Sequence, residues 1–367
     1  MSQETLQRLR VWLTEQRLDA YLVTHPQNRS YLSGWLNDDT EGAGMLLVDR
    51  ERQVLLTVPL YQEIAAREAM GWEILVPPAR EYATALVKLV SEIGAVRIGF
   101  EASAVTYAEY EHFKATFAGA VELVPYAKSA IDTLRLVKQP YEIELLRRAA
   151  AITDQTFAHL CNWLQPDMTE KEIQWEVMRK MLELGADGTS FETIVVSGPN
   201  GVMPHAHASS RRVQRGELIT IDMGARYKGY CADMTRTICL GEPSETRMVE
   251  LYETVLLAMK TCEAGLYANI SGKAADALAR NVLLAHDLGD YYIHGTGHGI
   301  GLQIHEAPDL KPSSPEDMIL PAGSVVTVEP GVYIPGWSGL RIENSGIVTE
   351  NGFEVLTQSP TQLVVPR

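Results

Sequence analysis

The chain has 367 residues, which is too long for one ordinary hydrophobic core and predicts two domains. Its 32 Lys and Arg residues against 47 Asp and Glu residues give a formal net charge of −15, which disfavours nucleic acid as a general partner. Four cysteines without a CxxC pair favour a reducing compartment, and no apolar run reaches the length of a membrane span. We therefore expect a cytoplasmic globular protein without a membrane partner.

Residues 1–130 alternate short apolar runs with helical patterns, which is typical of an α/β domain. An amphipathic helix over residues 1–13 lacks the apolar core of a signal peptide. Further helices are predicted over residues 60–70, 82–93 and 107–117. The predicted strands cover residues 20–23, 45–48, 54–58, 74–76 and 97–100. No glycine-rich phosphate loop and no cluster of metal-binding residue types occurs here, so we predict a support or recognition domain.

Residues 131–367 are predicted to form a second, α+β domain. Pro140 suits the first turn of a long helix. Thr169 and Glu172 have capping-box spacing at the start of another helix, which ends before Gly185. Two more helices are expected over residues 244–262 and 271–288. The strand-like stretches between and after these helices hold almost every chemically capable residue, so we expect the chemistry to lie on strands.

Two aspartates lie in a predicted β-hairpin. Asp222 ends an apolar run, and Asp233 follows a turn-like segment over residues 226–229. With the loop centred on Tyr227 and Lys228, the two aspartates face each other with Cβ atoms about 5 Å apart. Carboxylates that close repel each other unless a proton or a cation lies between them. Turn chemistry or exposure would explain a lone aspartate, but it explains two inside apolar strands less well.

Two glutamates end similar apolar runs, Glu329 after VVTV and Glu343 after GLRI. The Pro335–Gly336 pair between them indicates a turn, so we expect these strands to pair as well. Arg341 lies two residues before Glu343 and therefore on the same strand face. A salt bridge between these two residues is the simpler explanation, but it leaves Glu329 without a partner.

The segment HGTGHGIGLQIHE, residues 294–306, is dense in glycine and histidine. Glycine permits a close approach of the backbone, and imidazole is a common metal ligand. The three histidines, His294, His298 and His305, therefore favour a site over a structural loop. A weaker indication is the loop over residues 197–207, which ends in His205 and His207.

Five of these side chains supply four carboxylates and one imidazole: Asp222, Asp233, His298, Glu329 and Glu343. The set contains no thiolate and is too acidic for a structural zinc site, so Mn²⁺, Co²⁺, Fe²⁺ or Zn²⁺ would fit. Four negative charges need roughly two divalent cations, and such a pair can activate a shared water molecule and polarise a carbonyl. The sequence therefore predicts metal-assisted hydrolysis.

The order Asp, Asp, His, Glu, Glu closely resembles the pita-bread metallopeptidases, specifically prolidase and aminopeptidase P. The matching stretches are IDMGARYKGYCADMTRT, HGTGHGIGLQIHE, VVTVEPGVY and GLRIEN, and DAYLVTHPQNRSYLSGW resembles the family's smaller first domain. The resemblance implies a creatinase-type α/β domain followed by a pita-bread catalytic domain. It also implies hydrolysis of the Xaa-Pro bond in dipeptides or short peptides.

The resemblance also implies roles for the five ligands. Asp222 would chelate one metal ion, Asp233 and Glu343 would bridge two, and His298 would bind the other. Glu329 would bind that second ion and accept a proton from the attacking water.

Four further residues match pocket positions of the family. His205 and His305 would line the substrate site and stabilise the tetrahedral intermediate, and His294 would be another pocket histidine. Arg341 would orient a bridging carboxylate.

The resemblance also bears on substrate length and quaternary structure. Dipeptidases of the family place a basic residue near the substrate's C-terminal carboxylate, and here Lys311 is the only base in the matching stretch. Family enzymes are commonly homodimers. Trp35 and Arg29 are candidates for a contact between subunits, although packing is the simpler explanation for Trp35.

Two alternative classes share part of this pattern. A metal-free pita-bread relative, either a creatinase-like hydrolase or a binding module, would be expected to lose some of the five ligands, and all five are present. Methionine aminopeptidase shares the fold and ligands but typically lacks a first domain of this size. Residues 1–130 and the sequence PHA at residues 204–206 argue against it.

Overall fold

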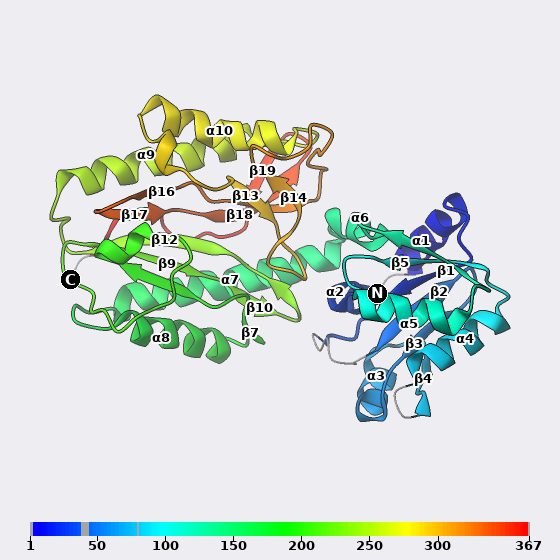
Figure 1. The fold of residues 1–367 in the computed structure, drawn as a ribbon. Coiled ribbons are helices and arrows are strands. Elements are labelled where there is room, and N and C mark those ends of the chain that lie inside the picture. The colour runs from blue at the N-terminus through cyan, green and yellow to red at the C-terminus, as the bar shows by residue number, and fades with distance from the viewer. Residues whose placement is uncertain (1–2, 38–43, 79–80, 366–367) are drawn as a thin grey trace. The chain divides into compact units, whose positions relative to one another are not determined.

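The computed structural model describes residues 3–37, 44–78 and 81–365. Its contacts divide the chain into two compact units, Met1–Arg135 and Leu136–Arg367. The division falls at the end of helix α6 (Ala130–Leu136), whereas the sequence placed it after residue 130. Figure 1 shows the helices and strands of each unit.

The first unit contains a mixed sheet with the strand order β4-β3-β2-β1-β5-β6. The strands are β1 (Ala20–Val23), β2 (Met45–Asp49), β3 (Gln53–Leu56), β4 (Glu73–Leu75), β5 (Arg97–Glu101) and β6 (Glu122–Tyr126). The other helices are α1 (Gln3–Glu15), α2 (Pro26–Ser33), η1 (Pro59–Tyr61), α3 (Gln62–Glu68), α4 (Tyr82–Glu92) and α5 (Tyr107–Phe117). All five predicted strands and the four predicted helices are confirmed. The first helix was predicted from residue 1, and residues 1 and 2 lie outside the described part. Strand β6 and helices α2 and α6 were not predicted.

The alternation of side-chain direction along β1 explains why this sheet is covered on both faces. Ala20 and Leu22 join the apolar core that contains α4 and α5. Tyr21 points to the opposite face, where its ring lies 5.3 Å from that of Trp12 in α1. Neighbouring strand residues point to opposite faces, so the α/β layering follows from an apolar run with no polar interruption.

The two residues considered for a subunit contact are buried in this unit. The exposed fraction of Trp35 is 1% and that of Arg29 is 2%. Trp35 packs against Tyr61, and the Arg29 guanidinium lies 5.5 Å from the centre of the Trp35 ring. Arg29 also donates to the backbone carbonyls of Asn37 and Gly44. Both side chains therefore serve packing within the unit, which was the simpler explanation for Trp35.

The second unit consists of strands between helices. Its helices are α7 (Pro140–Trp163), α8 (Glu170–Glu183), η3 (Gly198–Val202), α9 (Thr246–Gly265), α10 (Gly272–Ala285) and η4 (Gly289–Tyr291). Its first strands are β7 (Gly188–Thr189), β8 (Ile194–Ser197), β9 (Leu218–Met223), β10 (Ala225–Tyr227), β11 (Tyr230–Cys231) and β12 (Met234–Leu240). The later strands are β13 (Gly297–Gly299), β14 (Glu306–Leu310), β15 (Val325–Val328), β16 (Gly331–Ile334), β17 (Ser338–Arg341), β18 (Asn344–Thr349), β19 (Gly352–Val355) and β20 (Val364–Val365).

The helix boundaries in this unit confirm the local predictions. Helix α7 begins at Pro140, which lies in its first turn. The capping box before α8 is formed as expected: Thr169 Oγ1 accepts from the Glu172 amide at 3.1 Å, and Glu172 Oε2 accepts from the Thr169 amide at 2.6 Å. Each of these side chains satisfies a backbone donor that the helix leaves unpaired.

Two apolar cores enclose a polar layer in the second unit. Ile221 of β9 joins the core beneath α7 and α8, and Val328 of β15 joins the core beneath α9 and α10, which lie on the other side of the strands (Figure 1). Their neighbours Asp222 and Glu329 point the opposite way by strand alternation. The polar faces of the two strand layers therefore meet. The amide of Glu343 donates across this junction to the carbonyl of Thr235 at 3.0 Å.

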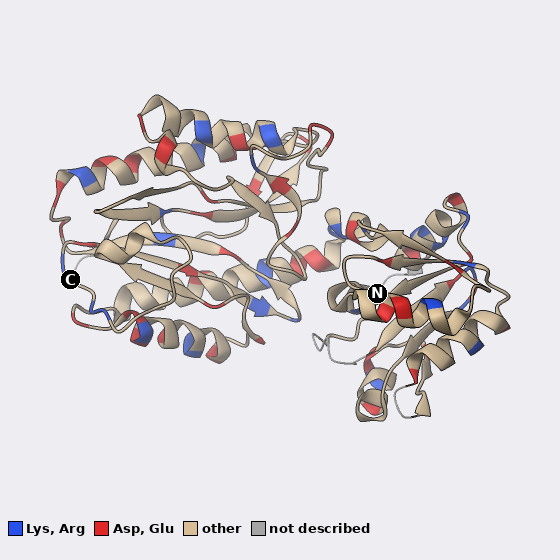
Figure 2. Cartoon of the chain, viewed as in Figure 1, with Lys and Arg blue, Asp and Glu red and all other residues tan. Residues whose placement is uncertain are grey.

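Figure 2 shows charged positions along the helices and also acidic positions on strands between the helix layers of the second unit. None of the four cysteines forms a disulfide with another described residue. Over residues 3–37, 44–78 and 81–365, no helix combines the length and apolar character that crossing a membrane requires.

Candidate active site

A cavity of about 440 Å³ lies in the polar layer of the second unit. The five predicted metal ligands all line it, and so do the other candidate residues of the second domain: His205, His207, His294, His305, Lys311 and Arg341. The ligands come from three separate stretches of strand and loop, so tertiary folding brings them together.

The hairpin carrying Asp222 and Asp233 is present, but its predicted register is wrong. The turn consists of Lys228 and Gly229, because Tyr227 pairs with Tyr230. Both turn residues have positive φ, 47° and 82°, as the tight turns favoured in hairpins require. Asp222 therefore pairs with Thr235, and Asp233 is its diagonal neighbour, two residues away on the same face. The predicted turn lies one residue too early, because glycine favours the second position of such a turn, which Gly229 occupies.

The strands that carry Glu329 and Glu343 pair as predicted. Val328 pairs with Asn344, and Gly331 pairs with Arg341, so Glu329 and Glu343 occupy facing positions between these two ladders. Pro330 follows Glu329 and has no amide hydrogen to donate, which explains why the ladder is interrupted at this point. The two glutamate side chains are left facing the cavity.

His298 lies on β13, a three-residue strand between β14 and β15. Glycines on both sides allow this position: a Cβ atom on Gly297 would come within 2.0 Å of the Thr327 carbonyl oxygen, and one on Gly299 within 2.3 Å of the Ala307 oxygen. The glycine pattern therefore serves a close approach of the backbone to neighbouring strands rather than to a ligand.

The His298 ring is oriented as a metal ligand would be. Its Nδ1 lies 3.1 Å from the Gly299 carbonyl oxygen, which can only accept, so Nδ1 carries the proton. The other nitrogen, Nε2, lies 3.5 Å from Asp233 Oδ2 and 3.4 Å from Glu329 Oε1. Burial lowers the pKa of His298, which keeps this nitrogen's lone pair available.

The carboxylates around His298 are crowded and poorly solvated. One ligand atom each from Asp233, His298 and Glu343 lies within 4.8 Å of the others. Burial, followed by the charges of Glu343, Asp222 and Glu329, raises the pKa of Asp233. Burial raises the pKa of Glu343 and raises that of Glu329 to about 7. Without a cation, the cluster would hold protons at neutral pH.

Arg341 supplies one compensating charge, but not where it was predicted. Its Nη2 donates to Asp222 Oδ2 at 2.6 Å, so its direct partner is not one of the expected bridging carboxylates. Its Nε donates to Thr235 Oγ1 at 3.0 Å, and that hydroxyl donates to Glu343 Oε2 at 2.7 Å. Arg341 therefore reaches Glu343 through Thr235. The simple Arg341–Glu343 salt bridge is not formed.

His294 is held by its surroundings on both sides of the ring. Its Nδ1 lies 2.7 Å from the Gly295 carbonyl oxygen, and its Nε2 lies 3.1 Å from the Tyr333 hydroxyl. That hydroxyl accepts from Arg341 Nη1 at 2.7 Å, so its own hydrogen points to His294. Burial lowers the pKa of His294 to about 4 and keeps the ring neutral.

The remaining candidates lie at the cavity wall with more freedom. His205 and His305 are both exposed, and the His305 ring centre lies 4.3 Å from that of His298. His207 pairs with Glu192 at 3.0 Å. Lys311 pairs with Asp309 at 2.7 Å.

Whether the residues fit divalent metal can be tested on Asp222. Its Oδ1 is buried and has no hydrogen-bond partner among the described residues, while Oδ2 is bonded to Arg341. A buried carboxylate oxygen without a donor is costly unless a cation compensates it. Arg341 balances one of the four carboxylate charges and leaves three, and the carboxylate oxygens with one imidazole form a donor set that suits divalent ions. The residues fit.

Three residues that hold this site were not identified from the sequence. Thr235 bridges Arg341 and Glu343. Thr327 Oγ1 accepts from the His298 amide at 3.0 Å and donates to Glu329 Oε1 at 3.3 Å. Tyr333 connects His294 to Arg341. Each threonine lies two residues from a predicted ligand on the same strand face, so the rule that singled out Arg341 would have found both.

The fold and cavity define a class, a two-unit protein with a carboxylate-rich site for divalent metal between two strand layers. The profile of metallopeptidase family M24 matches residues 144–350, and that of the creatinase/prolidase N-terminal domain matches residues 5–137. The chain therefore belongs to metallopeptidase family M24, and the predicted family and fold class are confirmed.

Several relatives extend over nearly the whole chain. A Xaa-Pro dipeptidase of Pyrococcus furiosus is 33% identical over 361 residues, 98% of this chain and 99% of that protein. The structure of a Xaa-Pro dipeptidase from Bacillus anthracis matches with a TM-score of 0.91 and 39% identity, covering 98% of this chain and 99% of that one. An X-Pro aminopeptidase from Thermotoga maritima matches with a TM-score of 0.87 and 31% identity, covering 95% and 98%.

Proposed function

We propose that this protein is a metallopeptidase that hydrolyses the Xaa-Pro bond of dipeptides or short peptides, using two divalent metal ions. The observation that carries the proposal is the convergence of four carboxylates and the His298 Nε2 atom at one cavity, where one buried Asp222 oxygen has no donor among the described residues. Full-length similarity to proteins described as Xaa-Pro dipeptidases supports the substrate class.

The ligand set supports two ions rather than one. Arg341 offsets one of the four carboxylate charges, which leaves three to be balanced by cations in a buried setting. One divalent ion leaves a net negative charge, whereas two leave room for an anionic ligand. We propose Asp222, Asp233, His298, Glu329 and Glu343 as the ligands and Mn²⁺, Co²⁺, Fe²⁺ or Zn²⁺ as the ions, with Mn²⁺ as the first to test. When bound, such ions supply Lewis-acid chemistry that activates water and polarises the scissile carbonyl.

The chain's own groups would handle the proton and the developing charge. We propose Glu329 as the acceptor of the water proton, because burial already raises the pKa of Glu329 towards neutrality. The Thr327 hydroxyl holds one of its oxygens in place. His205 and His305 line the same cavity and can donate to the oxygen that gains charge.

The cavity wall fits a substrate with a proline ring. Phe191, Ile194, Pro204 and Ile304 supply apolar lining. The nitrogen of an Xaa-Pro bond carries no hydrogen, so a pocket for it needs no acceptor at that position. We propose that Lys311 is a weak contact for a C-terminal carboxylate, because Asp309 already neutralises it, and that both dipeptides and longer peptides are accepted.

A metal and peptide panel tests the proposal. Metal-free protein is reconstituted with Mn²⁺, Co²⁺, Fe²⁺ or Zn²⁺ and assayed with Ala-Pro, Ala-Pro-Gly and Met-Ala-Ser. We expect two ions per chain and cleavage of the two proline peptides. Cleavage of Met-Ala-Ser alone would show a methionine aminopeptidase. Absence of any bound or activating ion would favour the metal-free relative.

His205→Ala tests the proposed donor. We expect kcat to fall by about 10²-fold or more, as for loss of one donor to a developing oxyanion, with metal content unchanged. An unchanged kcat would show that His205 has no part in catalysis.

A cytoplasmic location and a homodimer complete the proposal. The cysteines without disulfides support a reducing compartment, and the dimer is carried over from the family resemblance. Light scattering of the purified protein would measure the mass directly, against 40.6 kDa for one chain.

A further inference from the structure

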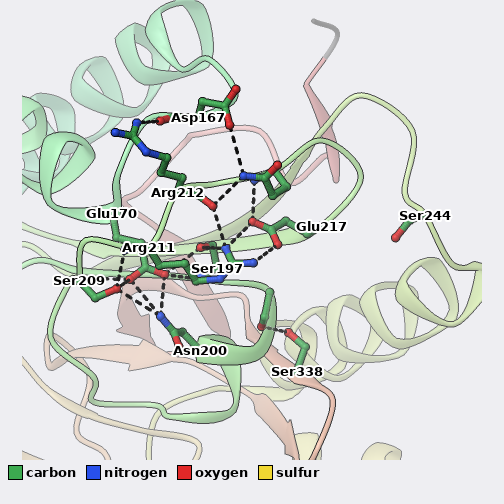
Figure 3. Close-up of polar contacts among 12 residues, drawn as sticks. Asp167, Glu170, Ser197, Asn200, Ser209, Arg211, Arg212, Glu217, Ser244 and Ser338 are labelled. Carbon is green, nitrogen blue, oxygen red and sulfur yellow. Dashed lines mark hydrogen bonds and ion pairs between the residues drawn. The ribbon is translucent and has the colours of Figure 1, made fainter.

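Glu170 is a buried carboxylate that lies outside the proposed ligand set, at the first turn of α8. Its exposed fraction is 0%, and protein donors surround both of its oxygens (Figure 3). Oε1 accepts from the Ser197 amide and the Ser197 hydroxyl, both at 2.8 Å. Oε2 accepts from the Ser209 amide at 3.0 Å and the Ser209 hydroxyl at 2.6 Å. The Asn200 amide contacts both oxygens at 3.1 and 3.2 Å.

These contacts join two points of the chain that enclose a cavity-lining loop. Ser197 ends β8, and Ser209 lies twelve positions later on the returning segment. Between them, residues 204–207 line the cavity, and His205 is among them. One carboxylate therefore holds both ends of the loop that carries the proposed donor.

The same loop has further attachments on its first half. Arg211 Nη1 donates to the Ser197 hydroxyl at 2.6 Å and also pairs with Glu217 (Figure 3). Ser338 of β17 donates to the Gly198 carbonyl at 2.6 Å. A Cβ atom on Gly201 would come within 2.8 Å of the Gly339 carbonyl oxygen, so the loop packs directly on β17. This is the strand that also presents Arg341.

His205 has no attachment of its own. Its ring makes no hydrogen bond or ion pair with any residue of the described part, and the residue is exposed. The position of the ring in the cavity therefore depends on where the backbone of the loop is held, and Glu170 holds both ends of that backbone.

We propose that Glu170 is a positioning residue for His205: it closes the loop over residues 197–209 and so fixes the distance from this imidazole to the reacting carbonyl. The inference rests on the proposed function, because it assigns Glu170 to the His205 of that mechanism. A misplacement of about 1 Å in a catalytic group can cost about 10²-fold in rate, so a buried anchor remote from the metal can control kcat.

Glu170→Gln is the sharpest variant, because it keeps the size and shape of the side chain. The amide has one accepting oxygen and one donating nitrogen. The serine hydroxyls can rotate to accept, but a backbone amide cannot, so either the Ser197 or the Ser209 amide loses its partner. Ser209→Ala is the milder variant, since it removes one hydroxyl and leaves both backbone bonds, and it serves if Glu170→Gln does not fold.

Asp154→Asn is the matched control. Asp154 accepts from the Gln358 amide at 2.8 Å, the Ser359 amide at 2.8 Å and the Ser359 hydroxyl at 2.6 Å, so it anchors a segment by the same chemistry. That segment does not line the cavity. Asp154→Asn therefore loses a comparable set of hydrogen bonds, while the loop that carries His205 stays attached.

Two readouts separate positioning from mere stability. Hydrogen–deuterium exchange of residues 197–209 should be at least about tenfold faster in Glu170→Gln and unchanged in Asp154→Asn. With Ala-Pro, Glu170→Gln should lower kcat by about tenfold or more, with a smaller change in KM and unchanged Mn²⁺ content. In the His205→Ala background the same substitution should change kcat by less than about twofold.

The outcomes distinguish the anchor from the proposed function. Equal kcat losses from Glu170→Gln with and without His205 would overturn the positioning role, and unchanged exchange would overturn the anchor. A wild-type protein that cleaves no Xaa-Pro peptide would overturn the proposed function. The exchange measurement needs no substrate, so it would still decide whether Glu170 holds the loop.

Discussion

The second unit contains two kinds of buried carboxylate, and they differ in what surrounds their oxygens. Glu170 accepts from serine hydroxyls, backbone amides and an asparagine amide, so each of its oxygens has several donors. Asp222 has a donor on one oxygen, and the described part of the chain offers none to the other. The Asp233 carboxylate has no hydrogen-bond donor among the described residues and only a 3.5 Å approach of His298.

The number of donors distinguishes a structural carboxylate from one that is suited to bind a cation. Protein hydrogen-bond donors can compensate the cost of burying a charge, as at Glu170, and the carboxylate then needs no cation. At Asp233 the neighbours are other carboxylates, so the cost is met only by protons or metal ions, whereas at Asp222, Arg341 compensates one of the two oxygens. Burial alone does not separate the two cases, because both kinds are almost fully buried. The number of hydrogen-bond donors around the carboxylate oxygens does separate them.

The largest effect should come from Asp233→Asn. Removing one of four crowded carboxylates should abolish turnover and reduce the number of bound ions. The metal-free variant should be at least as stable as the wild type, because like-charge repulsion from Glu343 and Asp222 is relieved. Calorimetric metal titration and urea unfolding would measure both.

Glu170→Gln should behave in the opposite way, with metal binding kept and stability lowered by about 1–3 kcal/mol through an amide left without an acceptor. Loss of metal in this variant, or near-normal activity in Asp233→Asn, would remove the distinction between the two kinds of carboxylate.

Thr235→Val should have an intermediate effect. The substitution keeps the shape of the side chain but removes the hydroxyl that donates to Glu343 and accepts from Arg341. Loss of a group that orients a ligand typically costs about 10–100-fold in metal affinity or activity. Thr235→Ser, which retains the hydroxyl, should recover most of the Mn²⁺ affinity, and equal defects in both variants would point to packing instead.

The smallest effect should be a pH dependence of stability that metal reverses. In the metal-free protein burial raises the pKa of Glu329 from 4.5 to about 7. The folded state then binds a proton that the unfolded chain has lost, so this contribution is fully present below about pH 4.5 and is lost as the pH rises through about 7.

Metal binds the deprotonated ligands, so the increase in melting temperature that it causes should grow over the same pH window. Thermal melts at pH 5, 6, 7 and 8 with and without Mn²⁺ would measure this, with Glu329→Gln as the control that flattens the metal-free slope. A metal effect independent of pH would show that the cluster carries no protons when empty.

Local patterns in the sequence predicted local structure well. Pro140 and the Thr169–Glu172 pair gave the starts of α7 and α8, and the turn before Glu343 gave the pairing with Glu329. The predicted hairpin register is wrong by two residues. The alternation of side chains along a strand fixes which face a residue occupies but not which residue of the neighbouring strand lies opposite. The direct partner of Arg341 was not predicted for a related reason. Asp222 is 119 residues away, and no spacing rule reaches that far.

The sequence by itself determined the family, the division into two domains and a set of acidic and histidine residues suited to metal, because these depend on residue types, order and short-range periodicity. The tertiary structure decided which oxygens have donors, which histidine is anchored only through its backbone, and that Glu170 joins Ser197 to Ser209. Those properties depend on contacts between segments brought together by folding, and no single segment of the chain specifies them.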